Sequence, residues 1–366
     1  MKLGRRDFVK GGLALSAMAS LPAVAKADVE FAPSPGEWRN FEVTTRLDIL
    51  HPAAPTRAWV PVPSIEAADW IRPGDYSWDG NGRLAGNELK PYGAKLVFIE
   101  WGPDISAPTA FVKSTVMTRD RAVDLTKPKH VAPLSAAEHA LFTAPTRLIP
   151  IDGLVKKTSN KITAGAHSDV EKAHRIYEWI VLNTFRDPKV RGCGLGDISF
   201  MLKTGDLGGK CADLNALFVG LARAAGLPAR DLYGIRVAPS RFGYKSLGAN
   251  SEIITKAQHC RAEVFLTNFG WVPVDPADVR KVVLEEPPGN LPLDHPKVQA
   301  ARRTLFGAWE GNWIPYNDAH DVALPQAAAP PQGFFMYPEA EAGGERLDSL
   351  DADSVKYVIE AREVTA

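Results

Sequence analysis

The chain has 366 residues, which is enough for two domains that each bury a hydrophobic core. Apolar residues make up 45% of the chain and charged residues 23%, which is ordinary for a globular protein. Lys plus Arg and Asp plus Glu balance at 43 each, and this neutral sum argues against a nucleic-acid or membrane-surface partner.

Residues 1–27 have the pattern of an export signal. Arg5 and Arg6 form a twin-arginine pair, residues 11–24 are apolar and small, and an Ala-x-Ala cleavage site ends at Ala27. The apolar stretch is shorter than the ~20 residues that span a bilayer. The pattern resembles a bacterial twin-arginine signal peptide, with a frayed N-terminal helix as the alternative. We therefore expect the twin-arginine export machinery as a partner and a periplasmic mature protein without a membrane anchor.

Residues 28–130 are expected to form a β-sandwich-like N-terminal domain. Residues 41–50 alternate apolar and polar side chains, as a half-buried strand does. Turn-forming residues such as those at 79–82 separate this stretch from further β-rich runs. These runs lie at residues 56–63, 95–101 and 110–119. No residue of this domain is singled out for chemistry.

Residues 131–300 change to a mixed helical and strand pattern, which predicts an α+β core. A capping-box pattern at Ser168 and Glu171 opens a first helix. A second helix starts near Cys211 and carries apolar residues at helical spacing until Gly226 stops it. Strands are expected after it at residues 231–237, 260–266 and 270–274. Residues 301–366 then form a β-rich C-terminal segment.

The chain has three cysteines, Cys193, Cys211 and Cys260, and an odd number leaves at least one thiol unpaired in an oxidising compartment. Cys211 falls in the first turn of the second predicted helix, where free backbone N–H groups and the helix dipole favour a thiolate. The backbone N–H of Cys211 is also a candidate oxyanion donor. We therefore expect Cys211 to react faster than the other two, which could form a disulfide. A buried structural cysteine is the alternative.

His259 opens a predicted strand that turns at residues 267–270 and returns as a second strand ending at Asp275. Such a hairpin brings Asp275 back toward the histidine, where a carboxylate can orient the imidazole. Each residue alone has an ordinary structural interpretation. A single histidine is usually a structural residue, and an Asp before Pro276 commonly starts a turn.

Three blocks resemble the transglutaminase-like superfamily, over roughly residues 165–285. They are Cys211-Ala-Asp-Leu-Asn-Ala-Leu-Phe, Gln258-His259-Cys-Arg-Ala-Glu-Val and Gly270-Trp-Val-Pro-Val-Asp275-Pro, in the order that the family has. The resemblance implies a papain-like α+β core in which Cys211, His259 and Asp275 transfer an acyl group through a thioester, with no cofactor.

The sequence departs from the family pattern beside the histidine. Many relatives have His-Ala-Trp where this chain has His259-Cys260-Arg261. Strand alternation should point Cys260 away from His259, so that it does not disturb the site. We assign no side chain as second oxyanion donor. Trp179 and Arg230 are expected to be structural, and Asp213 is expected to stabilise the start of the second helix. Gln258 is expected to lie on the wrong side of the strand to act as a donor.

The expected reaction is hydrolysis of an amide bond in a peptide or protein, with cell-wall peptides as one candidate substrate. One alternative is cross-linking, as by a protein-glutamine γ-glutamyltransferase with a lysine acceptor. A second is a non-catalytic module that binds a partner. No cluster of His and Cys has metal-ligand spacing, so no metal is expected.

Overall fold

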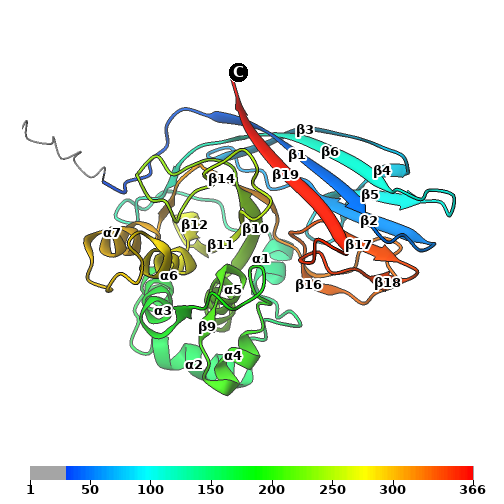
Figure 1. Cartoon of the computed structure of the whole chain (residues 1–366). Coiled ribbons are helices and arrows are strands. Elements are labelled where there is room, and N and C mark those ends of the chain that lie inside the picture. Colours follow the sequence, from blue (N-terminus) through cyan, green and yellow to red (C-terminus); the bar gives the residue numbers. More distant parts are fainter. Residues whose placement is uncertain (1–29, 366) are drawn as a thin grey trace, which may run out of the picture.

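The structure, a computed structural model, describes residues 30–365 (Figure 1). The predicted signal peptide and its cleavage site at Ala27 lie outside these residues. Within the described part, none of the helices combines the length and the hydropathy that crossing a membrane requires. Helices and strands are both abundant, and the predicted α+β class with a β-rich partner domain is confirmed.

Two antiparallel sheets pack face to face and form the sandwich. Along β1 (Arg39–Ile49) buried side chains alternate with more exposed ones, because one face of the strand packs on the second sheet. The first sheet has the order β19-β1-β6-β3, with β19 (Val355–Val364), β6 (Thr109–Thr118) and β3 (Ile71–Gly80). The second has the order β18-β17-β2-β5-β4, with β18 (Glu345–Arg346), β17 (Glu339–Ala342), β2 (Thr56–Pro61), β5 (Ala94–Trp101) and β4 (Arg83–Leu89).

The C-terminal segment is β-rich, as expected, but its strands complete sheets that other parts of the chain begin. Strand β19 pairs antiparallel with β1 along almost its whole length, and the two run side by side in Figure 1 as red and blue arrows. Strand β17 pairs with β2 in the second sheet. The sandwich therefore needs both ends of the chain.

The core sheet carries the strands that the sequence placed around the histidine. Its order is β12-β11-β10-β14 and all its pairs are antiparallel, with β12 (Gly270–Val274), β11 (Gln258–Leu266), β10 (Ala229–Arg236) and β14 (Trp313–Asn317). Helix α5 (Cys211–Ala224) packs on β10 and β11, and every one of its residues is buried. Helices α2 (Gly153–Thr163), α3 (Asp169–Asn183) and α6 (Pro276–Glu285) surround α5. A helix buried on all sides fixes its first residue firmly.

The remaining elements are short. They are α1 (Ala136–Thr143), α4 (Ile198–Thr204), α7 (Pro296–Thr304) and three two-stranded pairs: β7 (Arg121–Ala122) with β13 (Ala308–Trp309), β8 (Phe185–Arg186) with β9 (Gly208–Gly209), and β15 (His320–Val322) with β16 (Gln332–Phe334).

Local signals placed both predicted helices correctly. The hydroxyl of Ser168 accepts the N–H of Glu171 at 3.1 Å at the start of α3, but the Glu171 carboxylate accepts the N–H of His167 instead of completing the capping box. Helix α5 starts at Cys211 and ends just before Gly226, which has a φ of +86° that only glycine adopts easily.

Candidate active site

Cys211 is the first residue of α5 and is 3% exposed. Asp213 holds this helix start in place: its carboxylate accepts the backbone N–H groups of Lys210, Leu195 and Gly196, each at 2.9 Å. The expectation that Asp213 stabilises the helix start is met, and the same carboxylate also anchors the preceding loop. At the first position of a helix the Cys211 N–H has no intrahelical acceptor, so it is free to donate to a substrate oxygen.

The hairpin of β11 and β12 brings His259 and Asp275 together. His259 Nε2 lies 2.8 Å from Asp275 Oδ2, and the two side chains are 3% and 0% exposed. The other oxygen, Oδ1, accepts the N–H of Asp278 at 3.0 Å and caps α6. Asn215 of α5 donates to the same Oδ1 at 3.3 Å and to the carbonyl of Cys260 at 2.8 Å. Asp275 is thus both a helix cap and the partner of His259, so its two interpretations from sequence are compatible.

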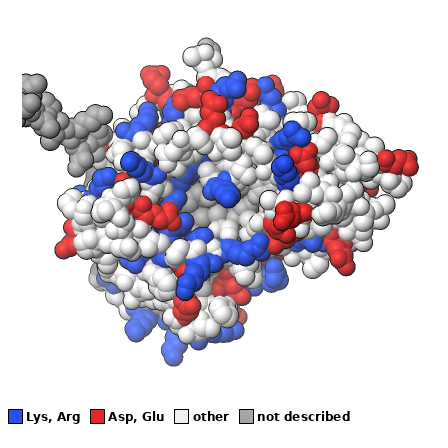
Figure 2. Space-filling view, in the orientation of Figure 1, with Lys and Arg blue, Asp and Glu red and all other residues white. Residues whose placement is uncertain are grey.

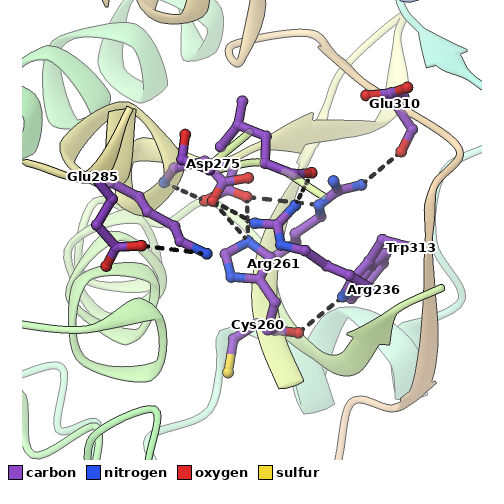
Figure 3. Close-up of polar contacts among 12 residues, drawn as sticks. Arg236, Cys260, Arg261, Asp275, Glu285, Glu310 and Trp313 are labelled. Atoms are coloured by element: carbon purple, nitrogen blue, oxygen red, sulfur yellow. Dashed lines mark hydrogen bonds and ion pairs between the residues drawn. The ribbon is translucent and has the colours of Figure 1, made fainter. Parts of the chain in front are cut away.

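A second carboxylate, which the sequence analysis missed, faces the same imidazole. Asp278 Oδ1 lies 3.3 Å from His259 Nε2 and 2.6 Å from Arg236 Nη2. Arg261 Nε approaches Asp275 Oδ2 at 3.6 Å (Figure 3). These four charged side chains are almost completely buried. They form a compact carboxylate–guanidinium network on one side of the ring.

This network sets the charge of His259. Burial lowers its pKa and so does the neighbouring Arg236, but Asp278 and Asp275 outweigh both and raise the pKa to about 9. Burial also raises the pKa of Asp275, while Arg236 and His259 hold the pKa of Asp278 well below its usual range against the effect of burial. At neutral pH the site therefore contains an imidazolium with at least one carboxylate beside it.

Three cysteines meet on the other side of the histidine. The Sγ atoms of Cys193, Cys211 and Cys260 all lie within 4.8 Å of one another, and all three residues are buried free thiols. The expectation that Cys260 keeps clear of the site is wrong, because its sulfur reaches the nucleophile. The predicted disulfide between Cys193 and Cys260 is absent among the described residues, where both cysteines are free thiols.

The thiol cluster favours a thiolate at Cys211. Burial raises its pKa, but hydrogen bonds from Cys193, Cys260 and His259, together with the charge of His259, lower it well below the ordinary value. The pKa of Cys193 is raised, chiefly by its hydrogen bond to Cys211, and burial raises that of Cys260. The two flanking thiols therefore stay protonated beside the Cys211 sulfur. Cys193 Sγ also lies 3.4 Å from the Gln258 carbonyl oxygen, and Cys260 Sγ lies 3.8 Å from Met336 Sδ.

Cys211 and His259 line an open cavity of about 590 Å³. One wall comes from residues 248–257, which lead into β11, and another from Tyr337, Val355 and Tyr357 near and on the C-terminal strands. Gln258, the first residue of β11, also lines this cavity. That its side chain lies on the opposite face of the strand from His259 stays a prediction. The sandwich and the core thus build the cavity together.

The other predicted structural residues lie away from the cavity. Trp179 is half-buried and packs against the main hydrophobic core. Arg230 forms ion pairs with Glu263 at 2.7 Å and with Asp318 at 3.0 Å, and its guanidinium stacks over Trp271.

Two groups of described residues have ligand atoms close enough to hold a metal ion. They are the three cysteines and the set of His259, Asp275 and Asp278. In each group the atoms already bind one another or a guanidinium, and a metal would have to displace these contacts. The sequence-based expectation of a metal-free site stays a prediction.

Comparisons with known proteins agree with this architecture. Residues 156–276 match the family described as the "Transglutaminase-like superfamily". An uncharacterized protein of Haemophilus influenzae is 35% identical over 365 residues, which cover 94% of this chain and 97% of that protein. A solved structure described as a "Putative Cysteine Protease", from Cytophaga hutchinsonii, superposes with a TM-score of 0.55 at 14% identity, covering 90% of this chain and 92% of that one.

A weaker likeness is to the periplasmic domain of TgpA from Pseudomonas aeruginosa. It has a TM-score of 0.34 and 13% identity, and covers 71% of this chain and 96% of that domain. The match with the Cytophaga structure, at its low identity, concerns the fold.

Proposed function

This chain belongs to the transglutaminase-like superfamily, and on that premise we propose that it is a cysteine hydrolase that cleaves amide bonds in a peptide or protein. The observation that carries the proposal is the buried arrangement of Cys211 at a helix start, beside a His259 whose other nitrogen is bound by Asp275. A structural cysteine needs neither a cavity nor a charged histidine.

In the proposed mechanism the Cys211 thiolate attacks the amide carbon, and the carbonyl oxygen becomes an oxyanion that accepts the Cys211 N–H. His259 donates its proton to the leaving amine, and the C–N bond breaks to give a thioester. Water then attacks the thioester, with neutral His259 accepting a proton from it. The thiolate leaves, and the products are a carboxylic acid and an amine.

Hydrolysis is favoured over cross-linking by the charges around the cavity. Its lining includes Lys210, Lys256 and Lys281, which repel the ammonium of a lysine acceptor. Water meets no such barrier in an open cavity.

Cell-wall peptides remain one proposed class of substrate. A non-catalytic binding module is disfavoured, because it would not need a histidine with a pKa of about 9 beside the cysteine.

The test is labelling and turnover at the proposed nucleophile. Cys211 should react with iodoacetamide at neutral pH roughly 10²-fold faster than Cys193 or Cys260, because the pKa is lowered at Cys211 and raised at the other two thiols. Cys211→Ser should abolish hydrolysis of a casein-derived peptide mixture, whereas Cys193→Ser should retain it. Equal labelling of the three thiols, mapped by mass spectrometry, would contradict the proposal.

We further propose that the protein acts in the periplasm after export by the twin-arginine pathway. The support is the Arg5–Arg6 pair and the Ala-x-Ala site that ends at Ala27. Replacing both arginines by lysine should leave the precursor in the cytoplasm, while wild-type protein starts at Asp28 in the periplasm. N-terminal sequencing of both fractions tests this, and unchanged export of the variant would overturn it.

A further inference from the structure

Lys and Arg side chains give the wall of the cavity that contains Cys211 a positive charge. Six Lys and Arg side chains contribute to its wall, and Asp and Glu do not occur among its lining residues in the described part of the chain. In Figure 2 the hollow on this face has Lys and Arg atoms inside it and along its edge. The lining cations are Arg186, Arg191, Lys210, Arg236, Lys256 and Lys281.

Carboxylates behind the wall neutralise only part of this charge. Asp278 pairs with Arg236 at 2.6 Å, and Asp348 pairs with Arg191 at 2.8 Å. Glu285 forms an ion pair with Arg186 and also faces Lys281 at 3.8 Å. One carboxylate therefore serves two cations, and an excess of positive charge remains on that side of the cavity.

The other two lysines have no such partner. Across residues 30–365 neither Lys210 nor Lys256 has a carboxylate within ion-pair distance. Lys210 directly precedes the nucleophile as the N-cap of α5, and Lys256 is exposed on the loop that leads to His259. These two charges therefore share the cavity wall with Cys211 and are free to meet a ligand.

We propose that the acyl donor carries a carboxylate close to the scissile amide, and that Lys210 and Lys256 bind it. This inference rests on the proposed hydrolase function and names its substrate class: an acidic peptide. Cations in a concave wall attract an anion more strongly than cations on an open surface, because less water screens them. Ile253 and Leu350, which are 62% and 40% exposed, also line the cavity and offer contacts for apolar neighbours of the acidic residue.

The first test measures the charge felt at the Cys211 sulfur without requiring turnover. Iodoacetate and iodoacetamide alkylate a thiolate by the same displacement of iodide, but only iodoacetate is an anion. We expect the iodoacetate-to-iodoacetamide rate ratio at Cys211 to fall roughly fivefold in Lys256→Met and further in Lys210→Met/Lys256→Met. Raising the salt concentration should lower the wild-type ratio in the same direction.

A matched control is Lys157→Met, which removes an exposed lysine from α2, away from the cavity. Its ratio should equal that of the wild type, and Lys256→Met should keep the wild-type rate with iodoacetamide. A double variant whose ratio equals that of the control would overturn the proposal.

The second test uses four versions of one peptide library: Glu or Gln at a fixed position, each with a free or an amidated C-terminus. A preference for Glu locates the carboxylate on a side chain, and a preference for the free terminus locates it at the chain end. Either preference should disappear in Lys210→Met/Lys256→Met and persist in Lys157→Met. Equal cleavage of all four versions overturns the acidic-substrate proposal but still supports the proposed hydrolase function. No cleavage of any version, with a lysine-dependent alkylation ratio, refutes the hydrolase and supports the anion-binding cavity.

Discussion

The two sides of the His259 ring are built from opposite kinds of chemistry. On the Nε2 side, Asp275, Asp278, Arg236 and Arg261 are fully buried charges that neutralise one another. On the other side the neighbouring side chains are thiols, and Cys211 carries its thiolate at the cavity that Lys210 and Lys256 also line. The carboxylate side fixes the protonation and orientation of the imidazole, and the sulfur side supplies the nucleophile. Each side can therefore be disturbed without removing the other.

The largest expected effect on the carboxylate side comes from Asp275. In Asp275→Asn the amide oxygen can still cap α6, but the amide nitrogen then faces the Nε2–H of His259, and two donors cannot share a hydrogen bond. We expect turnover to fall roughly 10²-fold, less than the ~10⁴-fold of serine triads, because a thiolate needs less help from a base. Asp275→Ala should lose more activity and also the helix cap, at a stability cost of about 1 kcal/mol.

The measurement is kcat/KM for a cleaved peptide together with thermal unfolding of both variants. If Asp275→Ala folds normally and turns over at the wild-type rate, the mechanism reduces to a pair of Cys211 and His259.

Asp278 should have a smaller effect on rate and a larger one on pH dependence. The wild-type alkaline limb of activity is expected near pH 9, where His259 loses its proton. This pKa exceeds the ~6.5 of an unfolded histidine, so the stability that protonated His259 contributes is complete below about pH 6.5 and lost as the pH rises through about 9. Asp278→Asn removes a carboxylate that raises this pKa, and should move the alkaline limb to lower pH.

Asp278→Asn also leaves Arg236 buried without its counterion, which costs about 3 kcal/mol in comparable pairs. Glu285→Gln is a matched control, because it removes a carboxylate that is not in contact with His259. Rate–pH profiles of the two variants show whether Asp278 raises the pKa of His259. An alkaline limb at the same pH in Asp278→Asn and wild type would show that Asp278 is a structural ion-pair partner alone.

The sequence predicted the residues on the sulfur side of His259 better than those on the carboxylate side. Cys211 and Gly226, the ends of α5, were predictable because capping and turn signals are local. Asp278 was missed because an acidic residue in the first turn of a helix has an ordinary explanation in the helix dipole. Arg236 was missed because it lies on β10, which pairs with the histidine strand β11. The sequence of one strand does not reveal which distant strand will pair with it.

The same limit explains two further features that the sequence did not reveal. Alternation along β11 tells which face Cys260 takes, but not how close the start of α5 comes to that face. The C-terminal strands were expected to follow the core. No local sequence signal indicates that β19 pairs with β1.

The smallest expected effect lies on the sulfur side, at Cys193. Its thiol lies within 4.8 Å of the Cys211 sulfur and helps to lower the pKa of the nucleophile. Cys193→Ala removes this thiol, whose effect is worth about 1 kcal/mol for a single hydrogen bond, and should move the acid limb of activity to higher pH by roughly 0.7 unit. Cys193→Ser keeps a hydroxyl donor at the same position and should stay closer to wild type. The measurement is the pH dependence of iodoacetamide alkylation at Cys211, whose acid limb should move to higher pH in Cys193→Ala only. An unmoved limb in both variants would mean that His259 alone holds the thiolate, and that the sulfur side adds packing but no electrostatic help.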